Sequence, residues 1–141
     1  MFIDASAIVA ILKGEPEASA FLAALQAAEG KVFCSPIARY EAVISLAAAI
    51  AREQPSGQIT RELKDEVESL VDELLQKAGA REIHITESIG KAARDASAVY
   101  GKLTGHPAKL NMGDCFAYAC AKAYRVPLLY KGDDFAHTDL A

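Results

Sequence analysis

The apolar and polar positions of the chain follow two periods that alternate along it. Short, nearly continuous apolar runs are typical of buried strands, and longer segments with apolar residues three or four positions apart are typical of helices. Strands separated by helices pair in a parallel sheet through right-handed crossovers. The pattern therefore predicts an α/β fold, a small parallel sheet flanked by helices. The predicted strands are residues 1–3, 31–34, 81–85 and 126–130, and the predicted helices are 5–13, 16–28, 36–52, 58–77, 87–102 and 111–124.

Several of these helix boundaries carry local signals. Ser35 and Pro36 have the order of an N-cap followed by the first helical position, and Thr86 is an N-cap residue before the segment 87–102. Gly30 and Gly79 follow two predicted helices, where glycine commonly ends a helix. These residues support the helix ends independently of the hydrophobic period.

The size and composition of the chain agree with one folded domain over residues 1–141. The sequence is 52% hydrophobic and 24% charged, as in globular and unlike disordered proteins. A domain of this length buries enough surface to fold without disulfides. The net charge of −4 lacks the basic footprint that usually marks nucleic-acid binding. It does not exclude such binding, because a divalent metal neutralises a carboxylate cluster.

Other features of the sequence argue against several classes of protein. Cys34, Cys115 and Cys120 form no C-x-x-C pair, so we expect buried thiols in a reducing compartment and no disulfide framework. The three histidines lack ligand spacing, which argues against a zinc site. No signal-peptide pattern is present, and the apolar stretch 42–51 is too short to cross a membrane. We therefore expect a cytoplasmic protein without a membrane partner.

The first acidic residue lies where a ligand site is expected. Asp4 directly follows the strand 1–3 and precedes a helix. Ligands in open α/β sheets bind at the carboxyl ends of the strands, so Asp4 is placed for chemistry. The alternative is that Asp4 only caps the helix that follows it.

Two further acids lie on helix faces that are expected to be packed. Glu41 shares its face with apolar residues, where a carboxylate is costly unless it is paired or binds a metal. Arg39 or Lys109 could supply the pairing charge. Asp114 also lies on a predicted packed face, although it could serve only the first turn of a helix capped by Asn111.

Asp133 and Asp134 follow the last predicted strand, where acids are also common in plain turns. Each acid thus has a local explanation. These explanations do not account for acids after two separate strands together with acids on the inward faces of two helices. Hard oxygen ligands without His or Cys suit Mg²⁺ or Mn²⁺. The chemistry that fits is phosphodiester hydrolysis, in which metal activates water and stabilises charge on the attacked phosphate.

The order and spacing of four segments resemble the PIN domain, specifically the VapC-type toxins of bacterial toxin–antitoxin pairs. The resemblance covers nearly the whole chain, and the main departure is the long acidic helix region around 58–77. It implies a three-layer sandwich with a sheet of four or five strands, and metal-dependent endoribonuclease activity. The segments are 2–6 (FIDAS), 39–41 (RYE), 110–119 (LNMGDCFAYA) and 128–135 (LLYKGDDF), the last leading to Thr138 and Asp139.

The resemblance also implies roles for individual residues. Asp4 and Asp114 would be the principal Mg²⁺ ligands, with Mn²⁺ as a substitute, and Glu41 would complete the site directly or through water. The fourth catalytic acid would be Asp133 or Asp134; Asp133 is favoured, and Asp134 is then a supporting residue. Ser6 would support the site by hydrogen bonding. Basic residues near these segments are candidates for contacting RNA phosphates: Lys13, Arg39, Lys109 and Lys131.

By the same resemblance the protein has macromolecular partners. VapC-type toxins are held inactive by a VapB-type antitoxin, whose C-terminal segment lies in a groove between helices and reaches the acids, and they usually form homodimers. The apolar faces of the segments 16–28 and 58–77 would suit such a partner, although stripes of this kind more often belong to the core.

Two other functions compete with this interpretation. A receiver-like phosphoacceptor domain also gathers acids and Mg²⁺ at the carboxyl edge of a parallel sheet, and Lys131 follows the last strand as that function requires. The strand 81–85, however, is followed by Thr86 and Glu87 instead of an aspartate. A catalytically inactive PIN-like module that only binds RNA or a protein is the third hypothesis. The set of mutually repelling carboxylates argues against it.

Overall fold

A central sheet of four parallel strands organises residues 1–140, the part of the chain that the computed structural model describes. Phe2 pairs with Phe33 on one side and with Leu128 on the other, so the first strand lies inside the sheet. The parallel pairing confirms the predicted α/β fold. In their order across the sheet, the strands are β3 (Arg81–Glu82), β2 (Phe33–Cys34), β1 (Phe2–Ile3) and β4 (Leu128–Leu129).

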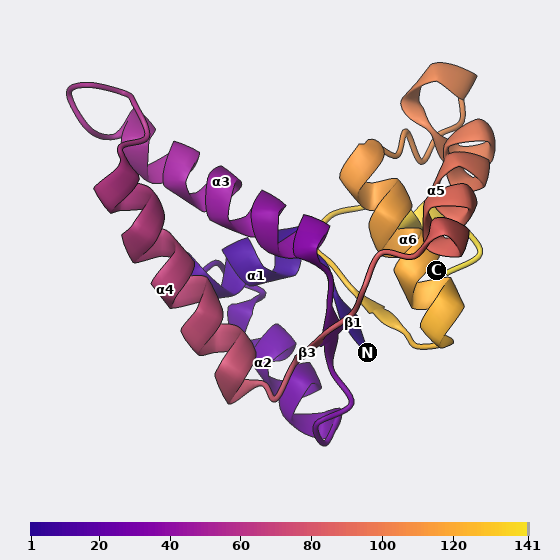
Figure 1. The fold of residues 1–141 in the computed structure, drawn as a ribbon, viewed down its shortest axis with the longest axis horizontal. Coiled ribbons are helices and arrows are strands. Elements are labelled where there is room, and N and C mark those ends of the chain that lie inside the picture. Colours follow the sequence, from indigo (N-terminus) through magenta and orange to yellow (C-terminus); the bar gives the residue numbers. More distant parts are fainter. Residues whose placement is uncertain (141) are drawn as a thin grey trace.

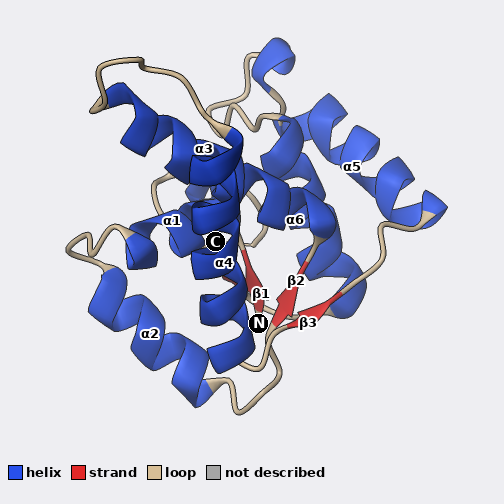
Figure 2. Ribbon diagram, turned by 60° about the vertical axis from the view of Figure 1, so that its left-hand side comes forward, coloured by secondary structure: helices blue, strands red, loops and turns tan. Residues whose placement is uncertain are grey.

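Helices cover both faces of this sheet. They are α1 (Ala5–Leu12), α2 (Ala18–Ala27), α3 (Pro36–Arg52), α4 (Arg61–Lys77), α5 (Glu87–Tyr100) and α6 (Met112–Tyr124), with two short 3₁₀ helices, η1 (Lys102–Thr104) and η2 (Asp134–His137). Helices α1 to α4 form one layer and α5 and α6 the other, with the strands between them (Figures 1 and 2). This is the predicted three-layer arrangement.

The helix ends follow the local signals closely, whereas the strands are shorter than predicted. The side chains of Ser35 and Thr86 accept hydrogen bonds from backbone amides three residues later, at 3.1 and 3.2 Å. Each strand has only two residues in ladder pairing. Helix α4 begins at Arg61, three residues later than predicted, because Thr60 caps it by accepting from the amide of Leu63. Helix α5 ends at Tyr100, because the next residue has extended backbone.

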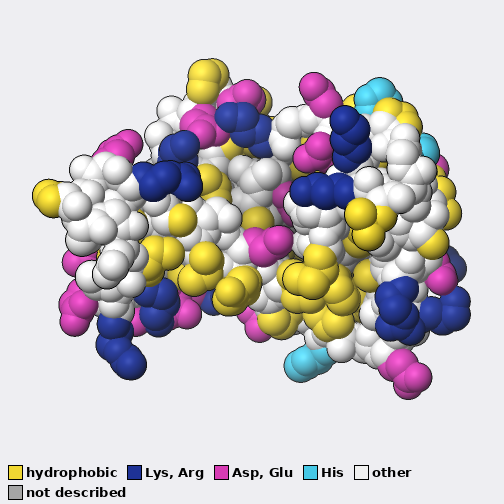
Figure 3. Space-filling model, turned by 90° about the horizontal axis from the view of Figure 1, so that it is seen from above, with side chains coloured by type: hydrophobic (Ala, Val, Ile, Leu, Met, Phe, Trp, Pro, Cys, Tyr) yellow, Lys and Arg dark blue, Asp and Glu magenta, His cyan; other side chains and the backbone are white. Residues whose placement is uncertain are grey.

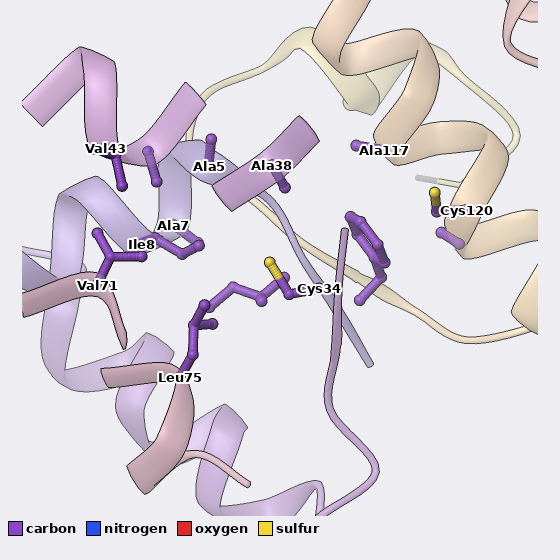
Figure 4. Close-up of a cluster of buried hydrophobic side chains, with 14 of the residues drawn as sticks. Ala5, Ala7, Ile8, Cys34, Ala38, Val43, Val71, Leu75, Ala117 and Cys120 are labelled. Carbon is purple, nitrogen blue, oxygen red and sulfur yellow. The ribbon is translucent and has the colours of Figure 1, made fainter. Parts of the chain in front are cut away.

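The hydrophobic core lies between the sheet and the helices on each side (Figure 4). Phe2, Ile3 and Ile8 have no exposed surface, which explains why the first residues of the chain read as a buried strand and helix. The three cysteines are free and buried, as predicted. Within residues 1–140, no helix combines the length and the apolar character needed to cross a bilayer.

Candidate active site

A pocket of about 350 Å³ opens at the carboxyl edge of the sheet. Residues from α1, α3, the start of α6 and the chain after β4 line it, so segments far apart in sequence meet here. In the view of Figure 3, acidic side chains lie in the middle of the molecular face, with basic side chains on both sides. The acidic residues that line the pocket are Asp4, Glu15, Glu41, Asp114 and Asp134.

Asp4 is held firmly at the end of β1. It is only 4% exposed, and its Oδ2 accepts hydrogen bonds from the backbone amide and the hydroxyl of Ser6, at 2.9 and 2.5 Å. The Ser6 hydroxyl in turn accepts from the backbone amide of Lys131, at 3.0 Å. Burial raises the pKa of Asp4, the hydrogen bonds from Ser6 act against this rise, and the nearby charge of Asp134 adds to it. Asp4 therefore caps α1 and also lines the pocket.

Glu41 reaches the pocket from α3 without a neutralising partner. Within residues 1–140 its carboxylate has no hydrogen bond or ion pair. Arg39 instead forms ion pairs with Asp72 and, at 2.7 Å, with Glu82, so the pairing considered for Glu41 does not occur. Burial, followed by the charges of two neighbouring aspartates, raises the pKa of Glu41 to about 7.

Asp114 lies in the first turn of α6 and closes a reciprocal capping arrangement. Its amide donates to the side-chain oxygen of Asn111 at 3.0 Å, and its Oδ2 accepts from the amide of Asn111 at 2.7 Å. Burial raises the pKa of Asp114 to about 6; the Asn111 amide and Lys102 oppose this rise, and Asp4 and Asp134 contribute to it. The capping role is therefore real, and it leaves the carboxylate facing the other acids.

Only one of the two acids after β4 joins this group. Asp134 lines the pocket, and its charge raises the pKa values of Asp4 and Asp114. Asp133 precedes η2 at an exposed position and is not among the lining residues. The structure thus brings Asp134, and not the favoured Asp133, to the acids. The reason lies in the tertiary fold, because the pocket forms where the chain after β4 meets α1, α3 and the start of α6.

Three of the four basic residues considered for RNA contacts already have acidic partners. Lys131 forms ion pairs with Glu15 and Glu17, and Lys13 lies 3.0 Å from Glu15. Arg39 is paired as described above, and Lys109 forms no ion pair within residues 1–140. Lys131 still lines the pocket, so it is the best placed of the four to meet a bound phosphate.

Sequence reasoning did not identify several residues of the pocket. Glu15, Ser45 and Asn111 line it, and Lys102 acts on Asp114 by its charge. Asn111 carried a signal as a helix cap, but nothing in the pattern linked it to the acids. Ser45 is one helical turn after Glu41, and that spacing was the available signal for its place beside Glu41.

The pocket has the chemistry of a site for a divalent cation. Its acids are oxygen ligands whose pKa values are raised first by burial and then by mutual repulsion, and a hard cation would relieve that repulsion. Among residues 1–140, no three Asp, Glu, His or Cys side chains are grouped closely enough to form a ready-made metal cage. Mg²⁺ usually keeps several waters and binds through one or two carboxylates, and the carboxylates that line the pocket are ligands of that kind. The residues that line the pocket therefore fit a divalent cation.

Comparison with known proteins agrees with this chemistry. The family model of the PIN domain matches residues 1–140. A VapC ribonuclease of Rhizobium meliloti (strain 1021) is 45% identical over 139 residues, covering 99% of this chain and 98% of that protein. Ribonuclease VapC42 of Mycobacterium tuberculosis is 37% identical over 140 residues, covering 99% of this chain and 96% of that protein. Because both the family model and these relatives span nearly the full length, the chain belongs to the PIN-domain family, in its VapC ribonuclease branch.

Proposed function

We propose that the protein is the toxin of a type II toxin–antitoxin system, an endoribonuclease that cleaves RNA phosphodiester bonds with a divalent metal. The observation that carries the proposal is the meeting of Asp4, Glu41, Asp114 and Asp134 in one pocket without a neutralising cation on Glu41. The family and the names of its relatives support a hydrolase that acts on RNA. The proposal treats residues 1–141 as one PIN domain acting in the cytoplasm.

In this mechanism the four acids have different roles around the metal. Asp4 and Asp114 would be the principal ligands of Mg²⁺, for which Mn²⁺ could substitute, and Glu41 and Asp134 would complete the negative pocket. The metal, when bound, activates water and stabilises charge on the attacked phosphate. Ser6 orients the Asp4 carboxylate through its two hydrogen bonds. Lys131 lies on the pocket wall, where its ammonium group can attract a phosphate of the RNA.

The proposed contact site for part of the antitoxin is a pocket of about 440 Å³ between α2 and α4, beside the residues that precede β2 and β3 and so at the edge of the sheet opposite the acids. Leu22, Leu25 and Leu74 line it, and Leu22 is 41% exposed. These are the two helices whose apolar faces suggested an antitoxin groove. The Leu22→Glu variant is expected to lose binding of a VapB-type antitoxin while it keeps RNA cleavage. Pull-down of purified antitoxin measures the first property, and retained binding would contradict the site.

The proposed homodimer surface lies around η1. Leu103 is fully exposed, and Met112, which lines the same pocket as Leu103, is 70% exposed. Large apolar side chains grouped on a surface often mark a protein–protein interface. Light scattering after size-exclusion chromatography would give twice the chain mass for the wild type and the chain mass for Leu103→Glu. A monomeric wild type would contradict this part of the proposal.

The test of the ribonuclease itself is cleavage of total RNA by the purified protein freed of any partner. Reactions with Mg²⁺, with Mn²⁺ and with EDTA are run beside the Asp114→Asn variant. Discrete fragments that require metal and vanish in the variant are the expected result, and the sequences of their ends name the target. Metal-independent RNA binding without cleavage, together with normal growth on expression in the native host, would point to the inactive PIN-like module instead.

A further inference from the structure

The first turn of α6 approaches Glu41 so closely that position 113 has no room for a side chain. A Cβ atom at Gly113 would lie 2.0 Å from Oε2, 2.1 Å from Oε1 and 2.3 Å from Cδ of Glu41. Real Cβ atoms do not make such contacts. Any residue larger than glycine at this position would therefore displace the carboxyl group of Glu41.

The backbone conformation does not explain the glycine. Gly113 is buried in the helix and is absent from the glycines with positive φ, unlike Gly105 and Gly132. Glycine in a helix is less favourable than alanine, because it loses more conformational freedom on folding. What distinguishes Gly113 is the carboxyl group that lies against it. Gly90 in α5 offers the contrast: a Cβ there meets only Nη1 of Arg94, at an ordinary 3.8 Å.

The contact matters because little else holds the Glu41 carboxyl group. It has no hydrogen bond or ion pair within residues 1–140, and the charges of Asp4 and Asp114 repel it. The amides of Asn111 and Asp114 are used in the capping arrangement, whereas those of Met112 and Gly113 donate no hydrogen bond among the described residues. These amides carry the partial positive charge of the helix start, which favours a nearby carboxylate.

We propose that Gly113 is a positioning residue that lets the Glu41 carboxyl group lie against the start of α6, beside Asp114. The absent side chain sets how closely the acid on α3 approaches the acid on α6. The consequence for metal binding rests on the proposed function, because that function makes Glu41 part of the metal site. The placement of the carboxyl group itself does not depend on it.

The test is a cycle of four proteins: wild type, Gly113→Ala, Glu41→Ala and the double variant. Mn²⁺ affinity is measured by calorimetry with the RNA-free protein. We expect Gly113→Ala to weaken Mn²⁺ binding about 10-fold, in the range found when groups that orient metal ligands are lost. In the Glu41→Ala background the same change should have no further effect, because no carboxyl group remains to be displaced. The matched control, Gly90→Ala, should leave Mn²⁺ affinity unchanged in both backgrounds.

Equal losses of affinity from Gly113→Ala in both backgrounds would overturn the proposal, and so would no loss in either. A crystal structure of Gly113→Ala gives a readout that requires neither metal nor activity. It should show an intact fold with the Glu41 carboxyl group moved away from α6, and an unmoved carboxyl group would refute the positioning role. If the wild type binds Mn²⁺ but cleaves no RNA, the proposed function fails while this inference is still decided by the cycle. If the wild type binds no Mn²⁺, the crystal structure decides it.

Discussion

Helix α3 separates two groups of acids that the protein treats differently. Arg39 forms ion pairs with Asp72 and Glu82, so each acid of this paired group has a cationic partner within the chain. Glu41, two residues further along the same helix, meets Asp4 and Asp114 without a cation. In the first group, both carboxylates therefore already have a cationic partner. The second is complete only with an external positive charge, which is why we place the chemistry there.

The largest effect on cleavage is expected when the acids around Glu41, the unpaired group, lose a proposed metal ligand. Asp4→Asn should lower RNA cleavage by at least about 100-fold, since the loss of groups that merely orient metal ligands already costs up to that much. The fold should survive, because Asn caps a helix as well as Asp does. Initial rates on a defined RNA fragment, with circular dichroism for folding, measure both. The control is Asp72→Asn in the paired group, which should cleave RNA at the wild-type rate. An equal loss of cleavage in this control would show that the two groups of acids do not differ in function.

The two neighbouring acids after β4 offer a sharper comparison. Asp134→Asn should reduce cleavage about 10-fold, because it removes one charge from the pocket lining. Asp133→Asn should stay within about twofold of the wild type, because that side chain lies outside the pocket lining. Both rates are measured under one saturating metal concentration. If Asp133→Asn reduced cleavage more than Asp134→Asn did, Asp133 would be the fourth acid.

The unpaired acids should also make the metal-free protein sensitive to pH. Glu41 and Asp114 have pKa values raised to about 7 and about 6, above their ordinary values of 4.5 and 3.8. Between the ordinary and the raised values the folded state binds more protons than the unfolded state, so stability falls as pH rises through this window. Glu41→Gln should therefore raise Tm at pH 8, by about 2–4 °C after allowance for partial exposure.

At pH 4.5 and below, where Glu41 is protonated in the folded protein, the same substitution should change Tm little. Differential scanning calorimetry in EDTA at both pH values makes this comparison. Mg²⁺ should reduce the gain at pH 8, because the cation offsets the same repulsion. An equal increase in Tm at both pH values would show that the charge of Glu41 is not the cause of the increase.

The smallest effect on stability is expected in the paired group. Arg39→Gln removes two ion pairs whose members are all partly exposed, with side-chain exposures of 33%, 50% and 44% for Arg39, Asp72 and Glu82. Such pairs contribute about 0–1 kcal/mol each, so the free energy of unfolding should fall by no more than about 2 kcal/mol. Urea denaturation measures this change, and RNA cleavage should stay at the wild-type rate. A large loss of cleavage would mean that Arg39 contacts RNA after all.

Features that depend on neighbouring residues could be predicted from the sequence. Caps such as Ser35 and Thr86 act over three residues, and the hydrophobic periods act over one or two turns, so the order of strands and helices could be predicted. The position of Asp4 and Asp114 at the pocket could be predicted for the same reason. One directly follows a strand, the other begins a helix, and the four matching segments supported both.

Features that depend on contacts between distant segments became visible in the folded molecule and could not be predicted from the sequence. Whether Asp133 or Asp134 lines the pocket depends on how the chain after β4 meets α1, α3 and the start of α6. The partners of Arg39 come from α4 and β3, thirty or more residues away. The need for glycine at position 113 arises because the end of the Glu41 side chain arrives from another helix. Periodicity and capping describe single elements, and these features are set where separate elements meet.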